Sequence, residues 1–456
     1  MGCTSSKQQT SRPSIRLRGD LSLKDLEKRR ISADETTSTN DLEIAYAYVT
    51  QRGYYPRERS KPNQDGCIVQ TTFGGDKNIS FFAVFDGHGL YGHFCARFCV
   101  KALPKNIEQE MRKYETENLN YGAVLTSACH MTNEQLRASD INDMHSGTTC
   151  CAMLIVGDKC YVANVGDSRA IVARRRRSDD RPPEANIKHF QTATLPTDAV
   201  KDTSNRLIAK PLSYDQTPFR KDERERVKKC GARVLTAQQL DGSKKVTEEF
   251  EQPGENEFDQ EGDPPRIWLK YRDTPGTAFS RSFGDAEAES VGVVGAPEIE
   301  VHEVRPEDTY IIIATDGVFE FLTNQNVVDV AQASVDPAGS DSDDVLKACE
   351  AITLEAYAQW MEYDIRSDDI TAIMLHIKRI SSSSSSSPIS RRASVDIERY
   401  QGIKSVGKHV TETAATENGV NNADTAGQSK SSARARTRGS IALTSVNIDI
   451  KEPDQE

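Results

Sequence analysis

Two short apolar runs, each stopping on an Asp-Gly pair, limit what this chain can fold into. Residues 81–85 (FFAVF) precede Asp86, residues 310–314 (YIIIA) come just before Asp316, and a glycine follows each aspartate. Runs of this length, rich in β-branched and aromatic residues, indicate strands buried on both faces. An Asp at the end of such a strand is held at the edge of the core, and the Gly lets the backbone turn sharply. The sequence therefore predicts two strands that deliver carboxylates to one place.

Two further acidic positions stand directly before apolar runs. Asp65 precedes residues 67–69, and the pair Asp368-Asp369 precedes residues 372–377. An Asp-Gly pair after a single strand indicates only a turn, but four acidic strand ends together favour a cation site. No His or Cys cluster accompanies them, and an all-oxygen ligand set favours Mg²⁺ or Mn²⁺ over zinc.

Seven motifs that include these positions resemble type-2C (PPM family) metal-dependent Ser/Thr protein phosphatases, in family order, over about residues 44 to 378. They are residues 63–65 (NQD), 85–89 (FDGHG), 146–149 (SGTT), 165–170 (VGDSRA), 280–285 (SRSFGD), 315–320 (TDGVFE) and 368–371 (DDIT). Residues 52–56 and 215–220 are similar to the plant and algal subgroup of that family.

The resemblance implies an α+β fold: an αββα sandwich of two mostly antiparallel β-sheets flanked by helices, with a flap subdomain. Strands that cluster apart from helices agree with this class. Residues 162–169 and 170–173 predict a strand-turn-strand hairpin around Gly166. Apolar residues at helical spacing in residues 91–98 and 345–357 predict two amphipathic helices.

Composition divides the chain into three parts. Residues 1–42 are polar, basic and poor in large apolar residues, which predicts disorder. Residues 43–380 contain the catalytic domain that the resemblance implies. Within them, residues 222–230 predict a charged helix, and residues 248–265 are implied to form the flap beside the site. The serine run and polar tail of residues 381–456 predict disorder.

Bulk properties exclude several classes of protein. The net charge of −11 argues against a nucleic-acid binder. The ten cysteines lack zinc spacing, and with no secretory signal they indicate buried thiols in a reducing compartment. No apolar run is long enough to span a bilayer. We expect a cytoplasmic monomer whose membrane contact, if any, comes through its N-terminus.

That N-terminus carries signals for lipid attachment. Gly2 with Ser6 fits the N-myristoylation pattern, and Cys3 is a natural palmitoylation site. A basic segment up to residue 30 follows, and one acyl chain needs such a second signal for stable anchoring. We expect attachment to inner-leaflet lipids on the cytoplasmic face; the alternative is an unmodified leader. Ser32 and Ser394 each follow an Arg-Arg-x pattern that basophilic kinases select, and a phosphate at Ser32 would oppose binding to anionic lipid.

The resemblance also implies a role for each acidic residue around two Mg²⁺ or Mn²⁺ ions per chain. Asp86 is expected to bridge them, and the Gly87 carbonyl joins one. Asp65 lies on one side, and Asp316 and Asp368 hold the other ion. Two such cations activate a water molecule for in-line attack on phosphorus, so no covalent phosphoenzyme is needed.

Other motif residues carry open alternatives. His88 either protonates the leaving seryl or threonyl oxygen or orients the site through hydrogen bonds. Asp143 is the nearest candidate for a third, weaker metal site. Asp167 and Asp285 are interpreted as residues that fix turns rather than bind metal.

Three departures from the family pattern matter. Gln64 stands where many members carry Glu, so it supplies no anionic ligand. Asp369 stands where Asn is usual, so either residue of its pair could be the ligand, and Asp368 is preferred. The phosphate-binding Arg is out of register, which leaves Arg59 and Lys61 as candidates.

Two functions are compatible with these residues. The first is a phosphatase that hydrolyses phosphoserine and phosphothreonine in phosphoprotein substrates. The second is a catalytically silent, membrane-anchored scaffold that binds a kinase or receptor. Loss of the bridging Asp or of its strand-end partners would favour the scaffold, and none is lost. The sequence therefore favours the enzyme.

Overall fold

A computed structural model of the chain describes residues 30–38, 41–113, 119–177, 206–247, 250, 263–335 and 342–380. All of them belong to one unit, Met1–Ser381, and the second unit, Ser382–Glu456, lies outside the described residues. Gly2, Cys3, Ser394 and the acidic part of the flap at residues 251–262 also lie outside them.

The first of two large sheets has six antiparallel strands. Their spatial order is β1 (Arg30–Ser38), β2 (Leu42–Gln51), β17 (Ile370–Arg379), β16 (Asp308–Ala314), β9 (Arg169–Arg174) and β10 (Ile208–Pro211). β16, the predicted strand at residues 310–314, lies between two partners. Both its faces are covered, which explains its continuous apolar run.

The second large sheet has five antiparallel strands. Their order is β15 (Glu298–Glu303), β8 (Lys159–Val165), β7 (Cys150–Val156), β4 (Ile79–Phe85) and β3 (Gly66–Gln70). All seven residues of β4 are buried, as its sequence predicts for a strand covered on both faces.

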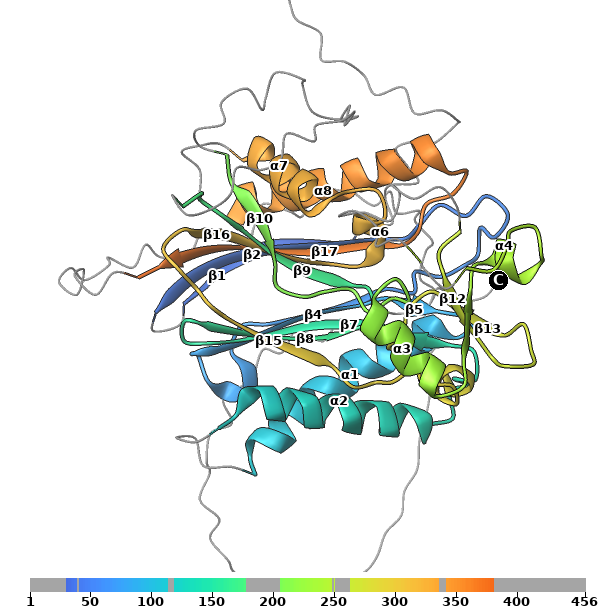
Figure 1. Ribbon diagram of the computed structural model, residues 1–456. Helices are drawn as coiled ribbons and strands as arrows, with labels where there is room; N and C mark the ends of the chain where they lie inside the picture. The colour runs from blue at the N-terminus through green and yellow to red at the C-terminus, as the bar shows by residue number, and fades with distance from the viewer. Residues whose placement is uncertain are drawn as a thin grey trace, which may run out of the picture. The chain divides into compact units, whose positions relative to one another are not determined.

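The two sheets stack face to face, and a helix pair covers each outer face (Figure 1). Alternate residues of β16 show how the layers are filled: Ile311 and Ile313 pack between the sheets, and Ile312 packs outward against helices. The outer layer there is α7 (Asn324–Ser334) and α8 (Ser342–Tyr363), and on the other sheet it is α1 (Gly92–Met111) and α2 (Tyr121–Arg137). This is the αββα sandwich that the resemblance implied.

Smaller elements gather at one end of the sandwich. A three-stranded sheet joins β14 (Phe283–Gly284), β6 (Gly147–Thr148) and β5 (Gly87–His88). The flap has its own three-stranded sheet of β11 (Arg233–Leu235), β12 (Arg266–Trp268) and β13 (Pro275–Thr277), and its own apolar core. Short helices complete this end: α3 (Lys221–Lys229), α4 (Ala237–Leu240), α5 (Ala286–Glu289) and α6 (Asp316–Phe319). The short helix η2 (Phe73–Gly75) lies at the opposite end, between β3 and β4.

The charged helix predicted in the flap is present as α3. Its end is marked by Gly231, whose φ of +97° only glycine adopts readily. The N–H of Gly231 donates to the carbonyl of Lys228 at 3.0 Å, and that of Ala232 to Val227 at 3.1 Å. These bonds satisfy carbonyls that the helix end leaves open.

Two expectations about strands are wrong. The predicted hairpin around Gly166 is not formed, because β8 and β9 belong to different sheets. Gly166, with φ of +105°, turns the chain from one sheet to the other. In addition, β1 begins at Arg30, inside the segment expected to be disordered up to residue 42. It pairs along the free edge of β2, where backbone hydrogen bonds compensate for its weakly apolar sequence.

Candidate active site

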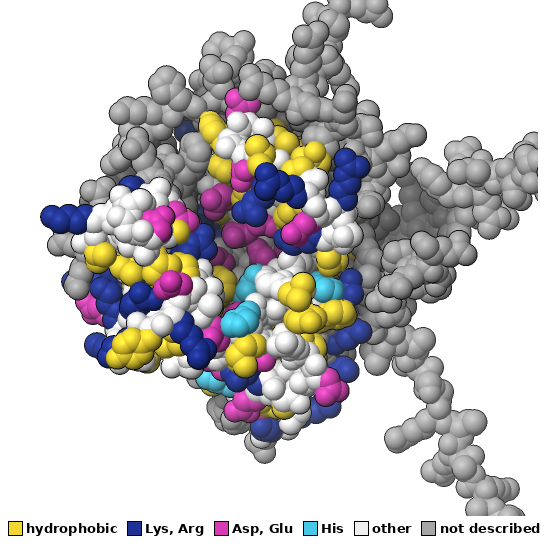
Figure 2. All heavy atoms as spheres, turned by 90° about the vertical axis from the view of Figure 1, so that its right-hand side faces the viewer, with side chains coloured by type: hydrophobic (Ala, Val, Ile, Leu, Met, Phe, Trp, Pro, Cys, Tyr) yellow, Lys and Arg dark blue, Asp and Glu magenta, His cyan; other side chains and the backbone are white. Residues whose placement is uncertain are grey.

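Four strand termini bring carboxylates to the same end of the sandwich. Asp86 follows β4, and Asp316 begins α6, separated from the end of β16 by Thr315 alone. Asp65 precedes β3, and Asp368 lies just before β17. We call these four carboxylates the acidic cluster. In Figure 2, which views this end of the molecule, acidic side chains gather in a hollow with histidines beside it.

Hydrogen bonds and electrostatic contacts show that the members of the acidic cluster are neighbours. The Thr315 hydroxyl donates to Oδ2 of Asp65 at 3.0 Å, although the two residues are far apart in sequence. The carboxyls of Asp86 and Asp316 lie within hydrogen-bonding reach of each other. The sequence prediction that separate strands deliver carboxylates to one place agrees with this geometry.

The carboxylates of the acidic cluster repel one another, and burial adds to the free-energy cost of their negative charge. Burial, followed by Asp369, raises the pKa of the Asp65 carboxyl well above its ordinary range. Burial, followed by Asp316, does the same for the pKa of Asp86. The pKa of Asp316 is raised to about 6 by burial and then by Asp368. Neighbouring carboxylates resist ionising together, and a bound cation would relieve this repulsion.

Two oxygens in the acidic cluster fit a metal ion. Oδ1 of Asp65 and Oδ1 of Asp316 are buried, and neither accepts a hydrogen bond from the described residues. Buried polar atoms are normally satisfied by a partner. Oxygen-only donors suit Mg²⁺ and Mn²⁺. The residues present therefore fit the metal that the sequence implied.

Gly87 lies in a place where only glycine fits. A Cβ on it would stand 2.5 Å from the carbonyl oxygens of both Gln64 and Gly92. The backbone of Gly87 therefore runs against the loop that carries Asp65. Gln64 supports this packing, since its Nε2 donates to the Gly89 carbonyl at 2.7 Å.

The adjacent residues Asp368 and Asp369 have different partners. Asp369 is buried, and its two oxygens accept the backbone N–H groups of Gly53 at 2.6 Å and Gln64 at 2.8 Å. Burial and then Asp368 raise the pKa of Asp369 to about 6. Asp368 accepts the Tyr55 hydroxyl at 2.6 Å and the Asp369 N–H at 2.8 Å, both on Oδ1. Oδ2 of Asp368 thus remains for another ligand, while Asp369 anchors two loops.

The two candidate phosphate-binding cations lie in different settings. The Nζ of Lys61 stands 3.8 Å from the centre of the Tyr55 ring, and its charge lowers the pKa of Asp369 against the effect of burial. Arg59 is exposed, and its carbonyl accepts a hydrogen bond from Arg52 at 3.0 Å. Lys61 is therefore the cation beside the carboxylates.

His88 contacts a residue that sequence reasoning assigned to a turn. Its Nε2 lies 2.6 Å from Oδ2 of Asp285, and its ring packs 4.4 Å from that of Phe279. Asp143, the candidate for a third metal site, forms an ion pair with Arg137 at 2.9 Å.

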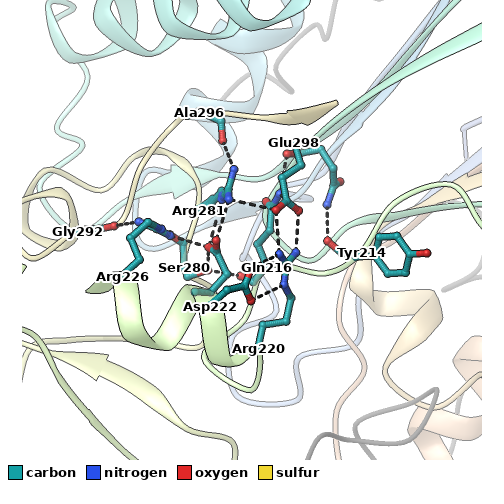
Figure 3. Close-up of polar contacts among 12 residues, drawn as sticks. Tyr214, Gln216, Arg220, Asp222, Arg226, Ser280, Arg281, Gly292, Ala296 and Glu298 are labelled. Carbon is teal, nitrogen blue, oxygen red and sulfur yellow. Dashed lines mark hydrogen bonds and ion pairs between the residues drawn. The ribbon is translucent and has the colours of Figure 1, made fainter. Parts of the chain in front are cut away.

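Another group of acidic residues lies where α3 meets β15, apart from the acidic cluster. Ligand atoms of Asp222, Glu223 and Glu298 lie within 4.8 Å of one another. Figure 3 shows the guanidinium groups that pair with them, from Arg220, Arg226 and Arg281. Although burial opposes it, hydrogen bonds from arginines hold the pKa of Glu223 at about 2. These charges are already neutralised, so they fasten the flap helix rather than offer a cation site.

Sequence reasoning missed two contributors to the site. Tyr55 was noted only as part of the subgroup motif at residues 52–56, and Asp285 only as a turn residue. Neither signal could reveal a contact with a residue hundreds of positions away, as between Tyr55 and Asp368 or between His88 and Asp285.

Comparison with known proteins agrees with this geometry. The family model "Protein phosphatase 2C" matches residues 56–365. The chain is 39% identical over 389 residues to "Probable protein phosphatase 2C 35" of Arabidopsis thaliana, covering 84% of this chain and 99% of that protein. It is 27% identical to "Probable protein phosphatase 2C 34" of the same plant, covering 72% and 79% of the two chains.

A solved structure supports the fold. The serine-threonine phosphatase 2C from Toxoplasma gondii superposes with a TM-score of 0.55 at 16% identity, covering 77% of this chain and 99% of that one. The chain belongs to the protein phosphatase 2C family, which consists of metal-dependent protein serine/threonine phosphatases.

Proposed function

We propose that the acidic cluster binds two Mg²⁺ or Mn²⁺ ions and that the site hydrolyses phosphoserine and phosphothreonine in proteins. The observation that carries this proposal is the pair of buried, unsatisfied oxygens on Asp65 and Asp316. The ligands would be the four carboxylates of the cluster and the Gly87 carbonyl, with Asp86 shared between the ions. Asp143, which forms an ion pair with Arg137, is not among these ligands and stays the candidate for a third, weaker site.

The cations, when bound, lower the pKa of a water molecule and neutralise charge on the phosphoryl oxygens. The chain's own residues do the rest. Lys61, held over the Tyr55 ring, supplies a positive charge to a phosphate that enters the hollow. His88, next to the acidic cluster, donates a proton to the leaving oxygen. Asp369 keeps the loops of Gly53 and Gln64 in register around the cluster.

The rival function, a silent scaffold, finds no support in the site. Each carboxylate expected to bind metal is present, and burial has already raised the pKa values of three of them. Such charge crowding destabilises a fold unless a ligand uses it. Retention of a strained acidic cluster favours catalysis.

Membrane attachment is a separate proposal that rests on sequence. Gly2 and Cys3 fit acylation, and the basic segment behind them would add attraction to an anionic inner leaflet. No helix within the described ranges has the length and apolarity to span a bilayer. Ser32 lies in β1, in register with Tyr48.

The catalytic proposal is tested with a phosphothreonine peptide and purified protein. We expect turnover that requires Mn²⁺ or Mg²⁺, is abolished by EDTA, and falls by about 10³-fold or more in Asp86→Asn. Asp222→Asn, which alters a paired carboxylate outside the acidic cluster, is the matched control and should retain activity. Metal-independent turnover, or near wild-type activity of Asp86→Asn, would refute the proposal.

A further inference from the structure

Asp285 has a strained backbone. Its φ of 54° and ψ of 52° are left-handed, and it is the one non-glycine residue with positive φ among the residues that the structure describes. This conformation costs free energy for any residue with a Cβ, least for Asn and Asp. Strain of this kind persists where the surrounding structure holds it, and it is frequent at functional sites.

The side chain of Asp285 does not cap the helix that follows it, although its position predicts this role. The residue is the N-cap of α5, yet its carboxylate makes no capping hydrogen bond. The turn is held by its backbone instead: its N–H donates to the Ser146 carbonyl at 3.0 Å, and its carbonyl accepts the Glu289 N–H at 2.9 Å. The interpretation of Asp285 as a turn residue therefore accounts for its backbone only.

The carboxylate is buried and directed at His88. Asp285 is 2% exposed, and its Oδ2 accepts hydrogen bonds from Nε2 of His88 and from the Ser282 hydroxyl, each at 2.6 Å. No Lys or Arg within the described segments forms an ion pair with it. A Cβ on Gly147 would stand 2.2 Å from the same oxygen. The neighbouring strand β6 therefore leaves room for this carboxylate only because residue 147 is a glycine.

We propose that Asp285 is the positioning residue for His88 in leaving-group protonation. The contact keeps a proton on Nε2 and fixes the ring against Phe279, which leaves Nδ1 as the nitrogen available to the leaving group. In this role Asp285 acts through His88 and not on the substrate itself. This inference rests on the proposed function and adds to it the residue that aims the proton donor.

A water oxygen forms a bond to phosphorus while the bond from phosphorus to the seryl or threonyl oxygen breaks. The leaving oxygen takes a proton from Nδ1 of His88, the attacking water gives a proton to solvent, and the imidazole regains its proton from solvent. An aliphatic alkoxide is a poor leaving group and needs that proton, whereas a nitrophenolate leaves without it.

Leaving-group dependence therefore separates positioning from a structural role. We compare Asp285→Asn with wild type on a phosphothreonine peptide and on p-nitrophenyl phosphate at saturating Mn²⁺. Asn tolerates the left-handed backbone and keeps the side-chain volume. We expect kcat on the peptide to fall about 10- to 100-fold, part of the total effect of an acid catalyst, and kcat on the aryl phosphate to change by less than about threefold.

A remote pair of the same kind supplies the matched control. His302 and Asp308 form a partly buried contact of 2.8 Å between Nε2 and Oδ2. Asp308 begins β16, whose other end leads to Asp316, so it lies roughly 20 Å from the site. Asp308→Asn should lower the melting temperature without changing the ratio of the two activities.

The double variant His88→Gln/Asp285→Asn completes the test. If Asp285 acts through His88, the double variant is no slower on the peptide than His88→Gln alone. Additive losses, or equal losses on both substrates in Asp285→Asn, would overturn the inference. His88→Gln leaves the turn intact, so an equal loss on both substrates there also overturns it should Asp285→Asn fail to fold. Wild-type protein inactive on both substrates would instead refute the proposed function.

Discussion

The hydroxyl of Tyr55 lies 2.6 Å from Oδ1 of Asp368, and this contact joins the loop before β3 to the start of β17. The Tyr55 ring also lies under Nζ of Lys61. One buried side chain therefore contacts both a carboxylate of the acidic cluster and the cation beside it. Burial, followed by the charge of Asp368, raises the pKa of Tyr55, so the phenol remains a hydrogen-bond donor.

Removing that hydroxyl should weaken metal binding more than it weakens the fold. Partners that orient a ligand typically account for 10- to 100-fold in metal affinity. Tyr55→Phe should raise the Mn²⁺ concentration for half-maximal activity by about tenfold or more, while the ring still supports Lys61. Tyr54→Phe is the control, because Tyr54 contacts Ser367 through its backbone. Unchanged Mn²⁺ dependence in Tyr55→Phe would show that Asp368 needs no such support.

Lys61 and Arg59 should differ in their effect on substrate binding. A charge-assisted hydrogen bond contributes about 1.5–3 kcal/mol, which corresponds to roughly 10- to 100-fold. Lys61→Met should raise KM for a phosphothreonine peptide by about tenfold, whereas Arg59→Met should change it little because that side chain is exposed. Steady-state kinetics at saturating Mn²⁺ provide the comparison. A larger loss in Arg59→Met would reverse the assignment.

The metal-free protein should become more stable on mild acidification. The folded pKa values of Asp316 and Asp369, about 6, lie above the unfolded value of about 4, so folding takes up protons between these limits. The resulting stabilisation is complete below pH 4 and is lost as pH rises through 6. Burial raises the pKa values of Asp65 and Asp86 as well, with the same sign. In EDTA, the melting temperature should therefore be higher at pH 5 than at pH 7.5.

Asp316→Asn should remove part of this dependence. The variant lacks one of the repelling carboxylates, so its metal-free form should melt above wild type at pH 7.5 and show a smaller gain on acidification. Differential scanning calorimetry in EDTA measures both effects. A lower melting temperature for the variant at pH 7.5 would mean that the carboxylate stabilises the fold rather than strains it.

Membrane association should depend on the first residues. Gly2→Ala should abolish partitioning onto anionic liposomes after coexpression with an N-myristoyltransferase, since the basic segment alone adds only about 1 kcal/mol per residue near the surface. Cys3→Ser should leave the weak, salt-sensitive binding of a single acyl chain. Liposome sedimentation at low and physiological salt separates these cases. Equal sedimentation of Gly2→Ala and wild type would exclude acylation as the anchor.

Local sequence patterns located the strands that carry the acidic cluster, because a fully apolar run between turn residues has few other interpretations. They could not place β1, whose sequence is only weakly apolar, nor show that the turn at Gly166 changes sheet instead of closing a hairpin. The sandwich itself came from the resemblance to a family.

Sequence patterns also could not assign separate roles to two adjacent residues of the same type. Asp368 and Asp369 are chemically identical, and their partners distinguish them: Asp369 accepts the backbone N–H groups of Gly53 and Gln64, and Asp368 accepts the Tyr55 hydroxyl. Likewise, no local pattern around Asp285 predicts that its side chain leaves its own helix for His88. Contacts between distant segments decide such roles, and a local pattern does not contain them.

The most direct test of the proposed dinuclear centre is to measure how many metal ions each chain binds. Equilibrium dialysis against Mn²⁺, followed by elemental analysis, should give two ions per wild-type chain. Asp86→Asn, which removes the carboxylate proposed to be shared by the two ions, should lower this number. Asp222→Asn, which alters a carboxylate already paired with Arg220, should leave it at two. A single ion or none in wild type, or two ions retained by Asp86→Asn, would contradict a dinuclear centre built from the four strand-end carboxylates.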